Sequence, residues 1–319
     1  MFRIGLLGAS RIARTAVIES AKRADGFVVS AVAARDPARA RNYAREHGIP
    51  AVAENYAALI DRDDVDVVYN ALPPAGHAPW TIAALNAGKA VLCEKPFARN
   101  AGEAASMVAA ARASGQPLLE AFHYRFHPVM RRAEALTREN ALGPPRAGAA
   151  EFNVAIARAP GELRWSADQG GGAMMDLGCY PLHATRTLIG AEPEIASAQA
   201  AFEDGVDAAM SAQLIFPGGV AVTIACSMIA PTVSAALRLD GERGSLEIVN
   251  FVAPQRGCRF AVTVNGRTRE EPTDGPTTYE AQLAHLHAVL TGEGAPLTGG
   301  ADAIANMTAI DAIYRSARS

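Results

Sequence analysis

Apolar runs alternate with helical segments through the first third of the chain. The segments between the runs have helical periodicity, and the one at 37–48 carries Pro at its start and Gly at its end, as helices often do. The runs show little alternation of polar and apolar positions, so both faces are expected to be covered, as in a parallel sheet with right-handed crossovers. Strands are predicted at 2–8, 27–34, 65–72, 90–94 and 117–122.

The pattern changes after about residue 122. Short alternating stretches follow in succession, many joined by turn signals such as Pro217-Gly218-Gly219, and they predict a mainly antiparallel sheet. Helices are expected near 173–189, 279–290 and 301–316. The predicted fold class is α/β, with a doubly wound parallel sheet in a first domain, residues 1–121. An α+β domain with an open, mainly antiparallel sheet is expected to follow in residues 122–319.

Composition and charge exclude several classes of function. Of the 319 residues 50% are hydrophobic and 20% charged, an ordinary globular balance, and the length suits about two domains. Lys and Arg number 30 against 33 Asp and Glu, a net charge of −3, so the basic surplus that a nucleic-acid partner requires is missing. No apolar run approaches the ~20 residues that span a bilayer, so no membrane partner is expected.

Cysteine and histidine spacing argues against a metal. The i, i+4 pair His123 and His127 is followed by Pro128 and lacks a neighbouring carboxylate, so it is not expected to bind a metal ion. The cysteines are far apart and form no CxxC pair, which favours a reducing compartment over a disulfide framework. These residues are Cys93, Cys179, Cys226 and Cys258. With an opening that resembles a strand more than a targeting leader, the chain is expected to be cytoplasmic.

The first predicted strand runs into a helix through a glycine motif. The residues Gly8-Ala9-Ser10-Arg11-Ile12-Ala13 give a Gly-x-Ser-x-x-Ala version of the dinucleotide motif of Rossmann domains. Gly8 permits the tight turn and Ala13 allows the helix to pack closely on the strand. Ser10 replaces the Gly that usually admits pyrophosphate, although its hydroxyl can donate to a phosphate oxygen. By itself the motif is equally compatible with a purely structural turn.

The end of the second predicted strand indicates the cofactor. The acid that binds the ribose of NAD lies about 20 residues beyond the motif. This chain has Ala34 and Arg35 there, with Arg39 one helical turn further on. Because a guanidinium matches phosphate geometry, NADP is expected and NAD is less favoured. The alternative is that both arginines are solvated surface charges.

Lysine is scarce in this chain, and one of the lysines directly follows a predicted core strand. Only Lys22, Lys89 and Lys95 are lysines, so 30 − 3 = 27 basic residues are arginines. Lys95 follows a predicted core strand, at the sheet edge where ligands bind, and lysine can act as an acid/base when its pKa is lowered. The alternative is a simple ion pair with the neighbouring Glu94.

Around Lys95 the chain resembles a known family. Glu94-Lys95-Pro96 is typical of the glucose–fructose oxidoreductase, inositol dehydrogenase and rhizopine-catabolism (Gfo/Idh/MocA) family, and the resemblance extends essentially end to end. Other matching segments are Asn70–Pro74 with His77, Glu120–Pro128, and Gly170–Pro181 with His183. Tyr180-Pro181 is similar to the branch of dimeric dihydrodiol dehydrogenases, NADP-dependent xylose dehydrogenases and anhydrofructose reductases. This implies hydride transfer between NADP and a sugar, cyclic polyol or related diol.

The resemblance also implies which residues bind the cofactor and substrate. The pyrophosphate is expected beside Gly8, Ala9, Ser10, Arg11 and Ile12, the 2′-phosphate beside Ala34, Arg35 and Arg39, and the nicotinamide beside Ala71, Leu72, Pro73, His77, Glu94 and Lys95. Trp165 and Tyr279 match positions that touch the cofactor in anhydrofructose reductases. Those enzymes carry Trp-Arg where this chain has Trp165-Ser166, with Arg164 on the other side. Arg125 and Arg164 are expected to contact the substrate.

Three polar residues share one expected helix face. Asp176, Tyr180 and His183 are spaced i, i+4 and i+7, although Pro181 is expected to kink or restart the helix. A tyrosine is too weak a base at neutral pH, with a pKa near ~10, but a lysine ammonium favours the phenolate. We therefore expect Tyr180 as acid/base, Lys95 as its electrostatic partner and proton relay, and Asp176 and His183 as substrate-orienting groups. The roles of Lys95 and Tyr180 are interchangeable at this level, and the alternative is a helix-capping Asp176 with a core Tyr180.

Two other functions remain open. A non-catalytic NADP-binding sensor would need no acid/base pair, so the presence of Lys95, Asp176 and Tyr180 argues against it. Redox-assisted glycoside cleavage with tightly held NAD is disfavoured by Arg35. The open sheet face must be covered in water, and the resemblance implies a homodimer or larger oligomer through the C-terminal sheet.

Overall fold

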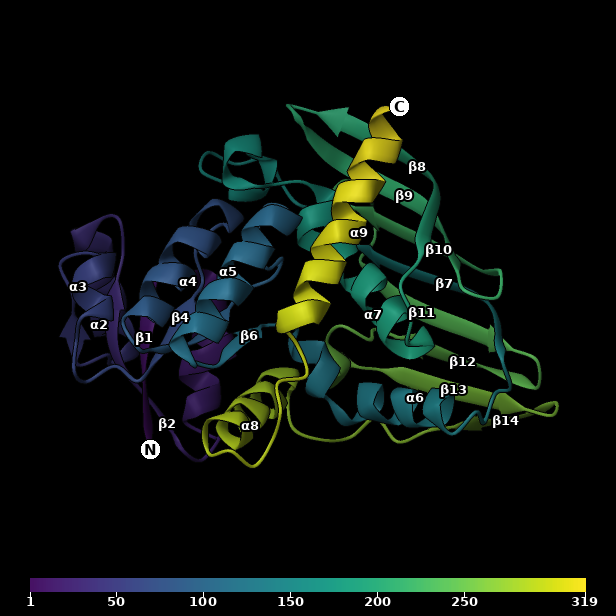
Figure 1. Cartoon of the computed structure of the whole chain (residues 1–319), viewed down its shortest axis with the longest axis horizontal. Coiled ribbons are helices and arrows are strands. Elements are labelled where there is room, and N and C mark those ends of the chain that lie inside the picture. The colour runs from purple at the N-terminus through teal and green to yellow at the C-terminus, as the bar shows by residue number, and fades with distance from the viewer. The chain divides into compact units, whose positions relative to one another are not determined.

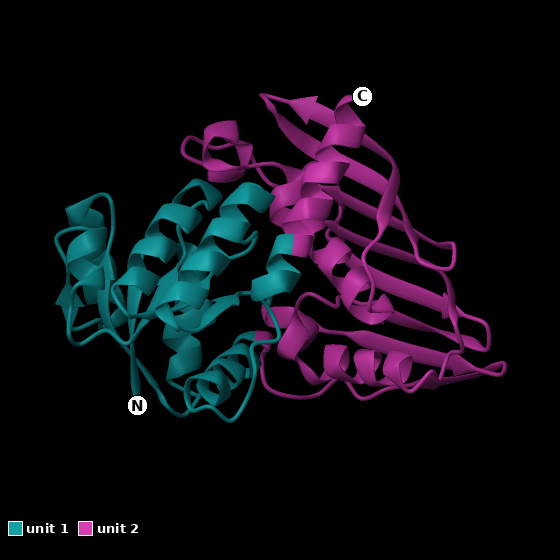
Figure 2. Cartoon of the chain, in the orientation of Figure 1, with its two compact units in different colours: residues 1–122, 279–304 teal, residues 123–278, 305–319 magenta.

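The computed structural model describes all residues, Met1–Ser319, and the chain forms two compact units (Figure 2). Unit 1 comprises 1–122 and 279–304, and unit 2 comprises 123–278 and 305–319. This differs in one respect from the expected division at residue 121, because the chain returns to unit 1 at Tyr279 and leaves it again after Ile304.

Unit 1 is built on a six-stranded parallel sheet with the strand order β3-β2-β1-β4-β5-β6. The strands are β1 (Phe2–Leu7), β2 (Phe27–Ala33), β3 (Ala51–Val52), β4 (Val67–Asn70), β5 (Ala90–Cys93) and β6 (Leu118–Glu120). All five predicted strands are present. The order reverses between β1 and β4, and ligands of such sheets bind at the carboxyl ends of the strands beside this reversal.

Helices lie on both faces of this sheet (Figure 1). They are α1 (Arg11–Ala13) with the π-helical turn η1 (Arg14–Glu19), α2 (Pro37–His47), α3 (Tyr56–Ile60), η2 (Pro74–Gly76), α4 (His77–Asn86), α5 (Ala101–Ser114) and α8 (Thr278–Leu290). α8 returns from the far end of the chain: Leu283 and Leu286 are buried in one core with Leu6 and Val17. Burial of this apolar face explains why residues 279–304 belong to unit 1.

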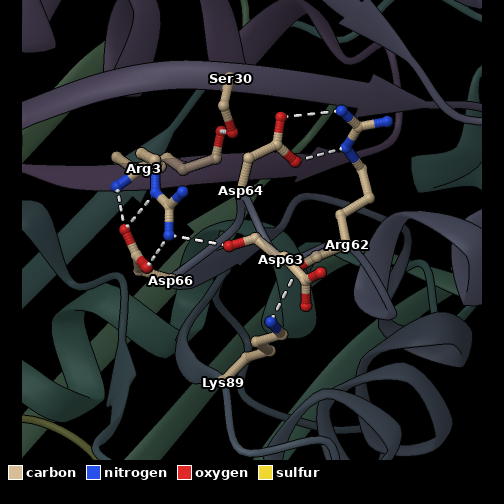
Figure 3. A network of polar contacts seen from close by, with 8 residues as sticks. Arg3, Ser30, Arg62, Asp63, Asp64, Asp66 and Lys89 are labelled. Carbon is tan, nitrogen blue, oxygen red and sulfur yellow. Dashed lines mark hydrogen bonds and ion pairs between the residues drawn. The ribbon is translucent and has the colours of Figure 1, made fainter.

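Charged side chains tie the amino ends of the strands together (Figure 3). The Arg3 guanidinium donates to both carboxylate oxygens of Asp66, at 2.9 and 2.7 Å, and Arg62 pairs in the same bidentate way with Asp64, at 2.6 and 2.7 Å. Lys89 Nζ donates to the Arg62 carbonyl at 2.8 Å. Lys89 thus has a structural role at the edge opposite to the one where Lys95 follows β5.

Unit 2 is built on an eight-stranded sheet with the order β14-β13-β12-β11-β7-β10-β9-β8. Every pair is antiparallel except β7 with β10. The strands are β7 (Pro145–Asn153), β8 (Glu194–Glu203), β9 (Val206–Phe216), β10 (Val220–Ser227), β11 (Ser234–Gly241), β12 (Gly244–Val249), β13 (Arg259–Val264) and β14 (Arg267–Glu270). The predicted fold class, a parallel sheet domain followed by a mainly antiparallel one, is confirmed.

Helices cover one face of this sheet (Figure 1). They are α6 (Pro128–Arg138), α7 (Cys179–Ile189) and the part of α9 (Gly300–Arg318) from residue 305 onward, with the short turns η3 (His123–Phe126), η4 (Leu163–Trp165), η5 (Ala167–Gln169), η6 (Met174–Gly178) and η7 (Pro254–Arg256). The expected irregularity near Pro181 is present: the π-helical turn η6 passes directly into α7 at Cys179. Pro181 falls in the first turn of α7, where its missing N–H is tolerated.

Candidate active site

The carboxyl edge of the unit 1 sheet gathers the loops predicted to hold the cofactor. Leu7, Asn70 and Cys93 are aligned across β1, β4 and β5, so the residues that follow them leave the sheet side by side. Gly8 has a positive φ of 96°, and a Cβ there would lie 3.2 Å from Leu72 Cδ2. The positive φ therefore favours glycine, and the close approach of Leu72 adds a tight contact for any larger residue. The predicted groups at Gly8, Ala71–Pro73 and Glu94–Lys95 thus share one edge.

The loop after β1 is held by three side chains. Ser10 Oγ accepts from the Ala13 N–H at 3.2 Å and caps α1, so the predicted serine has a local role besides any phosphate contact. From α2, Arg39 donates to the Ala9 carbonyl at 2.8 Å and the Tyr43 hydroxyl donates to the Ser10 carbonyl at 2.9 Å. Burial raises the pKa of Tyr43 to about 12, so it remains a donor at neutral pH.

A polar cavity of about 590 Å³ opens beside this loop. Its lining includes Ala9 and the cationic Arg11, Arg14 and Arg39, together with the carboxylates of Glu19 and Glu46, of which Glu19 pairs with Arg14. Arg35 is exposed at the end of β2 and follows the buried Ala34. An open cavity with several cationic side chains beside a glycine turn suits a phosphate-bearing nucleotide, so the residues present fit the implied dinucleotide.

His77 links two of the loops at this edge. Its ring is buried, with Nε2 2.7 Å from the Leu72 carbonyl oxygen and Nδ1 2.9 Å from that of Pro96. Burial lowers the pKa of His77, whereas the hydrogen bonds to the two carbonyl oxygens favour the protonated ring, and a neutral ring donates to only one of them. The predicted cofactor residue therefore connects the loop after β4 to the loop after β5, and a direct role beside the nicotinamide stays a prediction.

The acidic neighbour of Lys95 has a partner of its own. The Tyr69 hydroxyl, buried in β4, donates to Glu94 Oε1 at 2.5 Å, and the Lys95 backbone N–H lies 3.3 Å from Glu94 Oε2. Lys95 itself is half-buried, and its peptide bond to Pro96 is cis. Tyr69 thus orients the Glu94 carboxylate at the root of the lysine loop.

In unit 2, two tyrosine–histidine pairs join α7 to the turn η3. The Tyr180 hydroxyl lies 3.1 Å from His123 Nε2, and His183 Nδ1 lies 2.6 Å from the Tyr124 hydroxyl. All four side chains are buried. On the far side of His123, Nδ1 lies 2.9 Å from Thr278 Oγ1. The expected common face of Tyr180 and His183 therefore exists, and it points at two consecutive residues, His123 and Tyr124.

Asp176, in the π-helical turn, faces two charged residues of the preceding loop. Arg164 Nη1 lies 3.7 Å from an Asp176 oxygen, while its other nitrogens bind Glu162 in a bidentate pair at 2.8 Å. The Arg164 side chain is 35% exposed, so solvent and small molecules reach it. Asp176 and Arg164, both predicted to bind substrate, are thus brought together.

Arg125 has a different environment. It forms an ion pair with Glu134 of α6, and the two side chains are only 12% and 4% exposed. Arg131 and Arg138 also approach this carboxylate, at 3.4 and 3.6 Å. A buried charge pair of this kind is costly to separate, and the arrangement favours a structural role for Arg125.

The two aromatic residues predicted to touch the cofactor lie in different units. Trp165, in unit 2, donates from Nε1 to the Ile156 carbonyl at 3.1 Å, with the Arg158 guanidinium 4.3 Å from the ring centre. Tyr279, in the first turn of α8 and in unit 1, is 8% exposed and packs in the core of that unit. Their predicted contacts with the cofactor stay predictions.

A buried acid supports the segment that carries Asp176 and Tyr180. Asp207 accepts from the Met174 N–H at 2.7 Å and from the Tyr314 hydroxyl at 2.7 Å. Gly172 has a φ of 124°, and a Cβ there would lie 2.1 Å from Asp207 Oδ1. Burial raises the pKa of Asp207 to about 6. Asp207 therefore fixes the start of η6 in place of a local cap.

Sequence reasoning missed the residues behind the predicted ones. Three of these residues are separated from their partners in the sequence by at least one element, and no periodicity reports such contacts: Tyr69, Tyr124 and Asp207. The fourth, Glu162, lies only two residues from its partner Arg164. His123 was weighed only as half of a metal pair. No group of three or more His, Cys, Asp or Glu side chains is arranged to hold a metal ion. The model also contains no helix that is both long and apolar enough to cross a bilayer.

Family models match both parts of the chain. Residues 2–122 match the oxidoreductase family with the NAD-binding Rossmann fold, GFO_IDH_MocA, and residues 130–247 match the Gfo/Idh/MocA C-terminal domain. The two models leave residues 123–129 between them and residues 248–319 at the C-terminal end unmatched.

Individual relatives agree with the family models. A D-xylose 1-dehydrogenase (NADP(+)) of Haloferax volcanii is 34% identical, over 99% of this chain and 97% of its own. A trans-1,2-dihydrobenzene-1,2-diol dehydrogenase of Mus musculus is 36% identical, over 85% and 80%. The crystal structure of an aldose-aldose oxidoreductase from Caulobacter crescentus, complexed with glycerol, is similar with a TM-score of 0.91 and 30% identity, covering 99% and 97%. The chain therefore belongs to the Gfo/Idh/MocA family and is an NAD(P)-dependent oxidoreductase.

Proposed function

We propose that this enzyme transfers a hydride between NADP and an alcohol carbon of a sugar, cyclic polyol or vicinal diol. The observation that carries the proposal is the edge of unit 1 where Gly8, the Ala71–Pro73 loop and Lys95 meet. Xylose, aldoses and dihydrodiols, the compounds named for the relatives, share a secondary alcohol or its carbonyl. This shared secondary alcohol or carbonyl defines the proposed substrate class.

The preference for NADP rests on the arginines near the end of β2. Arg35 is exposed at the position of the ribose acid, the neighbouring Asp36 caps α2 by accepting from the Ala38 N–H, and Arg39 lies one turn further along. Arg35, Arg39 and Arg11 would bind the 2′-phosphate and pyrophosphate, with Gly8, Ala9, Ser10 and Ile12 shaping the turn. NAD, which lacks the 2′-phosphate, would bind less tightly.

The bound nicotinamide supplies or accepts the hydride, and the protein handles the proton. Tyr180 takes the proton from the substrate hydroxyl in the oxidative direction, while the Lys95 ammonium stabilises the phenolate and relays the proton. His183 and the Asp176–Arg164 pair bind substrate hydroxyls and orient the reacting carbon. Arg125, which forms a buried ion pair with Glu134, has a structural role in this proposal.

We also propose that the outer face of the unit 2 sheet joins two copies of the chain. Small residues cover this face in adjacent strands, among them Ala147 and Ala149 of β7, Ala221 and Thr223 of β10, and Ser211 of β9. These small residues permit close sheet-to-sheet packing, and the ion pair of Arg238 and Asp240 on β11, opposite Ala149 and Ala147, borders them. Light scattering of the wild type and of Thr223→Arg tests it; a monomeric wild type would exclude this interface.

The cysteines support a reducing environment. All four are free, three of them are buried, and none pairs with another. We propose the cytoplasm on this basis, and fractionation of cells that express the tagged chain tests the location.

The function is tested by NADP reduction with a panel of aldoses, inositols, anhydro-sugars and trans-dihydrodiols. Lys95→Met is compared with the matched control Lys89→Met, which removes a lysine from the opposite end of β5. We expect turnover with one substrate class, lost at least about 100-fold in Lys95→Met and retained in Lys89→Met. A wild type that binds NADPH and turns over none of these compounds would favour the sensor function.

A further inference from the structure

We propose that His123 is a positioning residue that shares a proton with Tyr180 and is held in place for this by Thr278 and Gln255. The inference rests on the proposed function, in which Tyr180 is the acid/base. His123 lies 57 residues before Tyr180 in sequence, and the structure brings them together at 3.1 Å between Nε2 and the hydroxyl oxygen.

The contact is buried and fixed on both sides. His123 is 5% exposed and Tyr180 is 4% exposed, and their ring centres lie 5.8 Å apart at an interplanar angle of 64°. Phe152 packs edge-on against Tyr180, with ring centres 5.5 Å apart. In such an apolar setting a hydrogen bond to a developing charge is stronger than in water.

The far side of His123 leads out of the core. Its Nδ1 lies 2.9 Å from the hydroxyl oxygen of Thr278, which is itself fully buried. Gln255, an exposed residue of η7, donates from Nε2 to the same Thr278 oxygen at 3.2 Å. The row Tyr180, His123, Thr278, Gln255 therefore runs from a buried phenol to the surface of unit 2.

The pair of Tyr180 and His123 has two states that contain the same atoms and carry the same net charge. In one state the Tyr180 O–H is intact and His123 is a neutral imidazole that accepts at Nε2, with its Nδ1–H donated to Thr278. In the other the O–H bond has broken, its electron pair stays on the phenol oxygen, and the proton forms the Nε2–H bond of an imidazolium. The phenolate then takes the proton of the substrate hydroxyl, so that Tyr180 is again a phenol and His123 stays an imidazolium until the pair loses one proton to solvent after the product leaves.

A second pair of titratable side chains lies beside Tyr180 within unit 2. The Tyr124 and His183 pair lies beside Tyr180, with the Tyr124 and Tyr180 ring centres 5.7 Å apart. Thr278 and Gln255, behind His123, do not titrate near neutral pH. A change in the ionisation of Tyr180 on substitution of His123 thus reports on their direct contact.

The test combines a spectroscopic titration with kinetics. The full chain is labelled with tyrosine carrying ¹³C at Cζ, and the Tyr180 signal is assigned by its loss in Tyr180→Phe. In the cofactor-free protein we expect His123→Gln and His123→Leu to raise the pH at which this phenol ionises, by about one unit or more in His123→Leu. We also expect a second inflection, due to His123, in the wild type and in His127→Asn and in neither His123 variant. His127→Asn is the matched control, because His127 is a buried histidine of the same segment that caps α6 and lies outside the row.

Kinetics separates this proposal from the function on which it rests. For a substrate found in the panel, His123→Gln should lower kcat about 10- to 100-fold with KM changed less than about threefold, and the alkaline limb should move to higher pH. A Tyr180 titration that is the same in wild type, His123→Gln and His123→Leu overturns the proposal even if the wild type is an active dehydrogenase. A shifted titration in a protein with no dehydrogenase activity supports the pair and rejects the proposed function.

Discussion

The hydroxyl of Tyr124 lies 2.6 Å from Nδ1 of His183, with both side chains fully buried. This contact commits Nδ1 to the protein, so a substrate hydroxyl bound by His183 would have to reach Nε2. The ring orientation is therefore set by the turn η3 as well as by α7.

From this contact we predict that loss of Nε2 raises KM, whereas loss of the partner of Nδ1 lowers the free energy of unfolding. His183→Asn keeps an acceptor near Nδ1 and removes Nε2, so we expect KM for the substrate to rise about tenfold. Tyr124→Phe removes only the inner partner, and should lower the free energy of unfolding by about 1 kcal/mol with KM changed less than about threefold. Steady-state kinetics and chemical denaturation of both variants make the comparison; an equal rise in KM for the two would argue against a substrate contact at Nε2.

Cofactor selectivity is predicted to depend on Arg35 more than on Arg39. Arg39 holds the Ala9 carbonyl at 2.8 Å, so Arg39→Ala should weaken the binding of both NADPH and NADH. Arg35→Ala removes a side chain proposed to contact only the 2′-phosphate, and should weaken NADPH about 10- to 100-fold with NADH unchanged. Fluorescence titration with each cofactor measures this, and equal losses of NADPH and NADH affinity in Arg35→Ala would contradict it.

His77 should matter for the two loops it connects. In His77→Leu the carbonyls of Leu72 and Pro96 lose their common partner, so we expect the free energy of unfolding to fall by about 2 kcal/mol and NADPH binding to weaken about tenfold. The pKa of His77 is lowered by burial, so below pH ~6.5 the unfolded chain binds the proton that the folded one does not. The wild type should therefore lose stability relative to His77→Leu as the pH falls from 7.5 to 5. Denaturation curves that keep a constant difference over this range would show that the ring is charged in the folded protein.

For Asp207 we predict that stability depends on pH with the sign opposite to that of His77. Its pKa is raised to about 6 by burial, from an ordinary value of 3.8. The folded protein thus binds the proton more readily, and this contribution to stability is complete below pH ~4 and is lost as the pH rises through about 6. Relative to Asp207→Asn, the wild type should be more stable at pH 4 than at pH 7 by about 2 kcal/mol. Subtracting the free energy of unfolding of each variant from that of the wild type separates this effect from that of His77. A difference that does not change with pH would show an ordinary pKa for Asp207.

Most of the fold was predictable because its elements are long and strongly patterned. The five predicted strands of unit 1 and the three helices near 173–189, 279–290 and 301–316 are present. β3 (Ala51–Val52) and α3 (Tyr56–Ile60) were missed because they are too short to show a period. The return of α8 to unit 1 was missed because an amphipathic helix does not specify which core its apolar face joins.

The candidate site was predictable where a backbone requirement fixes the residue type. Gly8 is an example, since its positive φ and its approach to Leu72 favour glycine over a residue with a Cβ. Side-chain partnerships were not predictable in this way. His123 was considered for a metal and lies against Tyr180, and Arg125 was considered for substrate and lies against Glu134. Such pairs are set by tertiary packing, which a single sequence does not report.

The central claim is direct hydride transfer from an alcohol carbon to NADP. The most direct measurement uses the substrate identified in the panel, with deuterium at its reacting carbon, in ordinary water, followed by mass and NMR analysis of the reduced cofactor. The account predicts one deuterium at C4 of the nicotinamide in each NADPH formed by the wild type, and no labelled NADPH above background with Tyr180→Phe or Lys95→Met. NADPH that carries only hydrogen from the solvent, or label transfer that survives both substitutions, would contradict it.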